Sequence, residues 1–132
     1  MREFETGATR DDEDGKLDYE GFLSPLVLRR YAEYMHGHRK QADGAFRDSD
    51  NWQKGIPQEV YMKSCWRHFM AWWSVHRAGG RKGRLLEDIL CAVLFNVMGY
   101  LHEMLKPPSA NAEHQAHCQA SPGCSCSQED QA

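Results

Sequence analysis

The sequence predicts an all-α protein, a small helical domain of about three main helices with a flexible N-terminal segment and a disordered C-terminal tail. Three observations predict this fold class. Apolar residues recur at spacings of three and four in three separate stretches, proline or glycine marks the ends of these stretches, and no stretch alternates as a strand does. The chain has 132 residues, which is the size of one domain.

Both ends of the chain are expected to lie outside this domain. Residues 1–20 contain eight acidic and three basic residues, and residues 107–132 contain almost no large apolar side chain. Such segments bury too little apolar surface to offset the entropy lost on ordering. The helical domain is therefore assigned to residues 21–106. A core of this size buries a modest fraction of its surface, so we expect a homo-oligomer.

The first helix is expected to begin at Ser24-Pro25, where a capping hydroxyl precedes a proline that needs no hydrogen bond. Its apolar residues, from Leu26 to Met35, recur at helical spacing, and the pattern fades near Gln41. Residues 42–56 contain glycines, acids and an asparagine, a composition typical of a loop.

The second helix is expected from Pro57 to about His76, followed by a left-handed turn at Gly79-Gly80. One of its sides carries Tyr61, Cys65, Phe69, Trp72 and Trp73, which we interpret as packing residues. The third helix is expected from about Leu85 to Lys106, where Pro107-Pro108 stops it. Apolar residues cover most of its circumference, so it is predicted to be the most buried helix.

The composition also predicts where the protein works. The longest apolar stretch, residues 89–100, is interrupted by Asn96 and is shorter than the roughly 20 residues that cross a bilayer, so no membrane span is expected. The N-terminus lacks the apolar core of a secretory signal, which favours the cytoplasm. The net charge of −3 argues against general affinity for nucleic acid.

The third helix carries candidate metal ligands. Asp88 and Asn96 are eight residues apart and share a helix face, and Glu87 lies at its edge. Carboxylate and amide oxygens suit Mg²⁺ or Mn²⁺, which commonly bind one or two carboxylates together with substrate phosphates. Two structural alternatives stay open. Glu87 and Asp88 are favoured in a first helical turn by the helix dipole, and Asn96 is explained equally by a hydrogen bond to a neighbouring helix.

The second helix carries candidate phosphate-binding and catalytic residues. Lys63 and Arg67 share one face, as expected of two cations that hold phosphate. His68 lies toward the apolar side, where an imidazole could orient a carboxylate or a water. The alternative is a histidine that only packs in the core.

The loop before the second helix gathers Asn51, Trp52 and Lys54 with Gly55, which together could cradle a base or a phosphate. It contains no Gly-x-x-x-x-Gly-Lys-Ser/Thr run, so it is not a P-loop. The tail offers zinc-binding residue types in His114, His117, Cys118, Cys124 and Cys126. Their spacing matches no pair of Cys-x-x-Cys knuckles, and an incidental tail is the alternative.

Several of these motifs occur together in one family. The run Asn51-Trp52-Gln53-Lys54-Gly55, then Arg67-His68, then Asn96 in Cys-Ala-x-Leu-Phe-Asn resemble the phage and bacterial dATP/dGTP diphosphohydrolases. The stretches 5–10, 15–19 and 24–26 look like the N-terminal signature of the same family. The resemblance covers about residues 5–106. The arrangement of acids on a helix is also similar to that of the all-α MazG-type pyrophosphohydrolases. Those proteins have Glu-x-x-Glu and Glu-x-x-Asp pairs, whereas this sequence has Glu87-Asp88 and Asn96.

The resemblance implies hydrolysis of dATP or dGTP to the monophosphate and pyrophosphate, with a divalent cation, in a phage nucleotide-pool pathway in the host cytoplasm. On this hypothesis Glu87, Asp88 and Asn96 bind Mg²⁺ or Mn²⁺, while His68 and Asp88 act in catalysis. The remaining candidates bind the purine deoxynucleoside triphosphate: Arg10, Lys16, Asn51, Trp52, Lys54, Lys63 and Arg67. The alternative is a non-catalytic helical module that senses a nucleotide or binds a partner protein.

Overall fold

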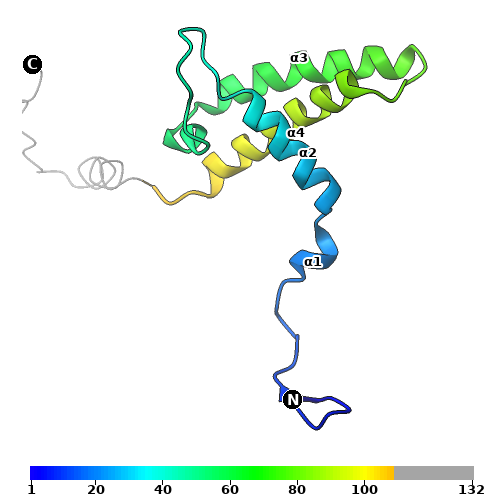
Figure 1. Ribbon diagram of the computed structural model, residues 1–132. Helices are drawn as coiled ribbons and strands as arrows, with labels where there is room; N and C mark the ends of the chain where they lie inside the picture. The colour runs from blue at the N-terminus through cyan, green and yellow to red at the C-terminus, as the bar shows by residue number, and fades with distance from the viewer. Residues whose placement is uncertain (109–132) are drawn as a thin grey trace, which may run out of the picture. The chain divides into compact units, whose positions relative to one another are not determined.

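The computed structural model describes residues 1–108 (Figure 1), which divide into two compact units. The first unit is Met1–Ser49, and the second begins at Asp50. The boundary lies inside the loop expected at residues 42–56. The structure is mostly helical, which confirms the predicted all-α class. The histidines and cysteines of the tail, considered above for zinc, lie outside the described residues.

The first unit opens with a small sheet that the sequence did not predict. Strands β1 (Arg2–Glu3) and β2 (Thr9–Arg10) pair antiparallel, with Arg2 opposite Arg10. Two residues per strand are too few to produce a visible alternation. Two exposed ion pairs accompany the hairpin, since Asp12 pairs with the N-terminal ammonium at 2.6 Å and Glu13 pairs with Arg2 at 2.9 Å.

Two helices follow in the first unit. Helix α1 (Tyr19–Phe22) is a single turn capped by Asp18. Helix α2 (Pro25–Gly37) begins as predicted, because the Ser24 hydroxyl accepts a hydrogen bond from Val27 N at 3.3 Å. It ends at Gly37, before the expected Gln41. The chain turns back there, and Gln41 N donates to Ala45 O at 2.8 Å instead of continuing the helix.

The second unit is built on two long helices. A short 3₁₀ helix, η1 (Asn51–Lys54), precedes helix α3 (Gln58–Arg77), and helix α4 (Arg84–Leu105) completes the unit. The ends of α3 and α4 match the predicted ends to within one residue. The predicted turn is also confirmed, since Gly79 and Gly80 have φ of 110° and 59°, and Gly80 N donates to Val75 O at 2.9 Å.

Helices α3 and α4 pack side by side as a hairpin (Figure 1). The buried residues of the described chain are Tyr61 on α3 and Cys91, Ala92, Asn96 and Gly99 on α4. This distribution confirms α4 as the most buried helix. The expectation for α3 was too broad, because Trp73 is 48% exposed and only the Tyr61 end of the predicted side is buried.

Helix α4 is also long enough to cross a bilayer. It has 22 residues, and its most apolar 18-residue window has a mean hydropathy of 1.4, with 28% of that window buried. The prediction of no membrane span considered only residues 89–100, the apolar centre of this helix. The core helix of a soluble protein meets the same length and composition criteria, so this property alone assigns no location.

Candidate functional site

The candidate site lies in the α3–α4 hairpin, where the two helices approach closely at Gly99. A Cβ atom on Gly99 would overlap the Tyr61 ring, so only glycine leaves room for this ring. Tyr61 also packs edge-on against Phe95, with 5.8 Å between ring centroids. The contact with Gly99 therefore sets the spacing of the two helices where the pocket forms.

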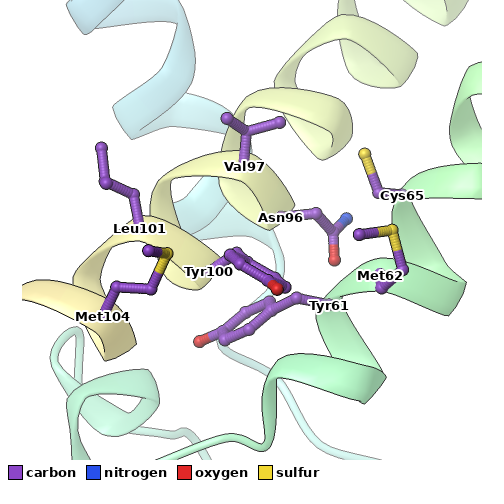
Figure 2. A pocket seen from close by; sticks show the side chains of 8 residues that line it. All are labelled: Tyr61, Met62, Cys65, Asn96, Val97, Tyr100, Leu101 and Met104. Carbon is purple, nitrogen blue, oxygen red and sulfur yellow. The ribbon is translucent and has the colours of Figure 1, made fainter.

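A pocket of about 320 Å³ opens between the helices beside this contact (Figure 2). Most of its walls are apolar or aromatic. The lining residues are Tyr61, Met62 and Cys65 of α3 and Asn96, Val97, Tyr100, Leu101 and Met104 of α4. This volume is at the lower end of the range for small-molecule sites, which typically combine apolar walls with a few polar groups.

Asn96 is the buried amide of α4 among the residues that line this pocket. It is 4% exposed, and its Nδ2 donates to the carbonyl oxygen of Ala92 at 2.7 Å. Figure 2 shows the amide reaching from α4 toward Met62 and Cys65 of α3. The sequence predicted that this amide would be buried and hydrogen-bonded, and both expectations are confirmed. The bond is made within α4, however, and not to a neighbouring helix.

Tyr61 contributes its ring to the pocket lining and carries a buried hydroxyl. The residue is 1% exposed, and its hydroxyl has no hydrogen-bond partner among the described residues. Burial raises the pKa of this hydroxyl above 10.0, and the negative charge of Glu103 raises it further. The hydroxyl therefore stays protonated at neutral pH. A buried hydroxyl without a partner is unfavourable unless a ligand supplies one.

Glu103 joins the segment before α3 to the end of α4. Its Oε1 accepts a hydrogen bond from Ile56 N at 3.4 Å, and Lys106 Nζ lies 2.5 Å from its Oε2. The bond from Lys106 is the main cause that lowers the pKa of Glu103, and the Ile56 N–H lowers it as well. Sequence reasoning missed Glu103 and treated Tyr61 only as a packing residue. The one available signal was a carboxylate in a largely apolar helix, three residues before a lysine.

The loop residues predicted to hold substrate lie close to this end of α4. Trp52 is half-buried and packs edge-on against His102, with 4.7 Å between ring centroids. Asn51 is half-buried, and Lys54 is exposed. The contact with His102 takes up part of the indole surface, and a role for Trp52 in stacking on a base stays a prediction.

On α3 the predicted phosphate-binding cations Lys63 and Arg67 are both exposed, and His68 is half-buried. This arrangement leaves the two cations accessible to an anion. Arg10 ends β2, and Lys16 lies in the turn that follows, with its N–H bonded to Glu13 O at 2.9 Å. Both belong to the first unit, and their assignment to the substrate stays a prediction.

The predicted metal ligands do not gather in one place. Glu87 is exposed and Asp88 half-buried in the first turns of α4, whereas Asn96 lies two turns further on. Eight residues of helix rise by about 12 Å. The side chains of Asp88 and Asn96 are short, and both Cβ atoms tilt toward the start of the helix. Even with two Mg–O bonds of about 2 Å added, these side chains do not span the rise between them. The geometry thus separates Asn96 from the acid pair.

The acid pair by itself fits a magnesium ion that is also bound by substrate. Two neighbouring carboxylates are the usual protein share of such a site, with phosphate oxygens and waters as the other ligands. Among residues 1–108, no group of three or more histidine, cysteine, aspartate or glutamate side chains could hold a metal. Metal binding by Glu87 and Asp88 therefore stays a prediction, and it requires phosphate oxygens of the substrate as further ligands.

The comparison with protein families identifies the chain. Residues 6–121 match the family described as dATP/dGTP diphosphohydrolase, N-terminal. No curated protein and no solved structure matches the chain. The family match covers most of the chain, including the greater part of each compact unit and the whole α3–α4 hairpin. The chain therefore belongs to the dATP/dGTP diphosphohydrolase N-terminal domain family.

Proposed function

We propose that the protein hydrolyses a purine deoxynucleoside triphosphate to the monophosphate and pyrophosphate. The observation that carries this proposal is the match of residues 6–121 to a family named for that activity. The α3–α4 hairpin supports it, because an apolar pocket, two exposed cations and two carboxylates lie on the same pair of helices. A base, a triphosphate and a magnesium ion need those three kinds of site.

In the proposed reaction, water oxygen bonds to the α-phosphorus, and pyrophosphate leaves with the bridging oxygen. Glu87 and Asp88 would hold Mg²⁺ or Mn²⁺, which neutralises phosphate charge and acidifies a bound water. His68 orients the attacking water. The remaining task is to stabilise the charge that develops on pyrophosphate, and the exposed cations Lys54, Lys63 and Arg67 perform it.

Pyrophosphate release from each of the four deoxynucleoside triphosphates, with Mg²⁺, Mn²⁺ or a chelator, tests the proposal. We expect turnover of dATP or dGTP, abolished by the chelator. Asp88→Asn should lower the rate at least about 100-fold, because the carboxylate charge that binds the metal is lost. Asp48→Asn, an exposed loop position, is the control for loss of one acid. A folded protein that releases no pyrophosphate from any of the four would refute the activity.

One observation favours a second candidate function, a nucleotide sensor or interaction module without turnover. The described residues bring no third acid, histidine or cysteine to the Glu87–Asp88 pair. A non-catalytic protein would bind a non-hydrolysable dATP or dGTP analogue and release no pyrophosphate from the natural triphosphates. Calorimetry with the analogue, beside the release assay, separates the two candidates.

We also propose that the protein is a homo-oligomer of the cytoplasm, of a phage-infected host if it is phage-encoded, that binds neither membranes nor nucleic acid. The net charge of −3 supports the last point. One face of α3, which we call the aromatic face, supports assembly. It consists of four exposed side chains that lie within an arc of about 100° around the helix axis: Trp66, Phe69, Met70 and Trp73. An exposed patch of this kind commonly marks a protein interface.

A further inference from the structure

We infer that a second copy of the protein covers the open side of the pocket, with the α3–α4 hairpins of the two copies packed against each other as a four-helix bundle. This arrangement rests on the homo-oligomer of the proposed function and defines its interface more closely. It adds a face of α4 to the aromatic face of α3, and it identifies what covers the apolar lining of the pocket.

Both helices carry an exposed apolar stripe with the repeat of a coiled-coil seam. Successive members are separated by four and three residues in turn, which keeps each stripe within about 80° of arc around its helix. All of them are at least 38% exposed, and none is charged. The α3 stripe consists of Met62, Trp66, Phe69 and Trp73, and the α4 stripe consists of Leu90, Leu94, Val97, Leu101 and Met104.

The two stripes border the same pocket. Met62 lines it from α3, and Val97, Leu101 and Met104 line it from α4 (Figure 2). No lysine, arginine, aspartate or glutamate is among the lining residues. The surface around the pocket therefore suits an apolar partner that reaches both stripes at once, as another pair of helices does.

The hairpin has little core of its own. Its buried residues are mostly small, and Tyr61 is the one large side chain that is fully buried in the described part of the chain. The nine side chains of the two stripes expose about 900 Å² together, if each offers roughly 200 Å² and about half of it is exposed. Stable interfaces typically cover about 800 Å² on each partner. The exposed area is thus of the size that a stable dimer needs.

A second hairpin matches this surface, whereas the end of the chain does not. Residues 107–132 contain no phenylalanine, tryptophan, tyrosine, leucine, isoleucine, valine or methionine, so they offer no large apolar side chain to place in the pocket. A second copy presents the same two stripes with the same repeat. The side chains of one copy can therefore fit between those of the other across a two-fold axis.

The charges at the helix ends favour an antiparallel arrangement of the four helices. Both long helices have an acid in the first turn, Glu59 in α3 and Glu87 in α4. Both have basic residues in the last turn, among them Arg77 in α3 and His102 in α4. Neighbouring helices of an up-down bundle run in opposite directions, so the acidic start of a helix in one copy lies beside the basic end of a helix in the other.

Trp73→Glu tests whether the second copy covers the pocket. Trp73 is 48% exposed and lies two turns from Cys65, a half-buried thiol that lines the pocket. We expect this variant to have the monomer mass in light scattering and to show several-fold faster alkylation of Cys65, followed by peptide mass spectrometry. Val60→Glu makes an apolar-to-acid change on α3 outside the stripe, and it should leave both the larger mass and the slow alkylation unchanged. Loss of the larger mass without faster alkylation of Cys65 would overturn the inference.

Val97→Glu tests the contribution of α4. A charge without a partner in the middle of the α4 stripe should move the midpoint of dissociation to a protein concentration at least about 100-fold higher. Leu85→Glu, outside the stripe in the first turn of α4, should not move it. An unchanged midpoint in folded Val97→Glu would confine the interface to α3 and overturn the inference. If Val97→Glu fails to fold, the alkylation of Cys65 in Trp73→Glu still decides.

Two further outcomes separate the bundle from the proposed activity and from a lipid surface. Pyrophosphate release by a protein that is monomeric at every concentration would leave the activity standing and remove the bundle. Formation of the bundle without pyrophosphate release would do the opposite. Slower alkylation of Cys65 on addition of neutral vesicles to the monomeric Trp73→Glu variant would assign the pocket to lipid and overturn the inference.

Discussion

At the scale of single residues, Tyr61 and Asn96 show how two helices can be packed tightly around polar atoms. Tyr61 fits because residue 99 is glycine, and Asn96 fits because the carbonyl of Ala92 accepts its amide. Both side chains are buried, but they differ in their hydrogen bonding. The Asn96 amide has a partner, while the Tyr61 hydroxyl has none among residues 1–108.

Tyr61→Phe should increase the stability of the ligand-free protein. The substitution removes a buried hydroxyl without a partner and keeps the ring against Gly99, so we expect a gain of about 1 kcal/mol in the free energy of unfolding. Urea denaturation at neutral pH measures it. Tyr100→Phe, at a half-buried neighbour, is the control and should change little. A loss of stability in Tyr61→Phe would show that the hydroxyl has a partner in solution.

Gly99→Ala should destabilise the hairpin. Alanine favours a helix over glycine by about 1 kcal/mol, but a methyl group here overlaps the Tyr61 ring, and overpacking of this kind costs about 1–3 kcal/mol. We expect a net loss, measured by urea denaturation. Gly37→Ala tests the propensity alone, since nothing lies within 4 Å of a Cβ at that position. If both variants gain stability, the Tyr61 ring does not lie against Gly99.

At the scale of elements, the helix ends were predictable from the sequence and the contacts between helices were not. Ser24, Gly79 and Gly80 act on their own neighbours, so their capping roles can be read from adjacent residues. The contact of Tyr61 with Gly99 joins residues 38 positions apart in sequence, and no local pattern encodes such a pair. Asp88 and Asn96 share a helix face, and this angular relation alone suggested a common site. Their distance along the helix axis also follows from the sequence and separates them.

The attachment of the segment before α3 to the end of α4 should depend on pH through Glu103. Because the folded pKa lies below 4.5, the carboxylate contributes stability above that value and loses its contribution as pH falls through the folded pKa. Glu103→Gln should therefore be less stable than the unchanged protein at pH 7, and the difference should shrink below about pH 4.5. Urea denaturation between pH 7 and 3 measures it. A difference that stays constant would show that the charge of Glu103 is not involved.

The aromatic face of α3 should determine the oligomeric state. Trp66 is 60% exposed, so Trp66→Glu is expected to place a charge in the interface with little effect on the fold. Light scattering after size-exclusion chromatography should give the monomer mass for this variant and a multiple of it for the unchanged protein. Leu85→Glu, in the first turn of α4, is the control for an apolar-to-acid change and should keep the larger mass. A monomer in every case would remove the aromatic face as an interface.

At the scale of the whole molecule, two compact units share one family match, and the hairpin of the second unit holds the pocket. The fold class was predictable because it follows from the hydrophobic period of each segment. The composition of the pocket was not predictable, since it depends on which faces of α3 and α4 meet. Met62 and Met104 had no special interpretation in the sequence, yet both line the pocket with Asn96.

Helix α4 should stay packed against α3 in the presence of lipid. A bilayer would have to accept Asn96 in its interior, together with Glu87, Asp88 or Glu103 at the helix ends, and it would separate the Tyr61 ring from Gly99. We therefore expect the protein to remain at the bottom of a flotation gradient with neutral or anionic vesicles. Flotation with both kinds of vesicle, with α4 protected from added protease, would instead assign α4 to the membrane. Flotation with anionic vesicles alone, reversed by salt, would indicate surface binding through Lys and Arg.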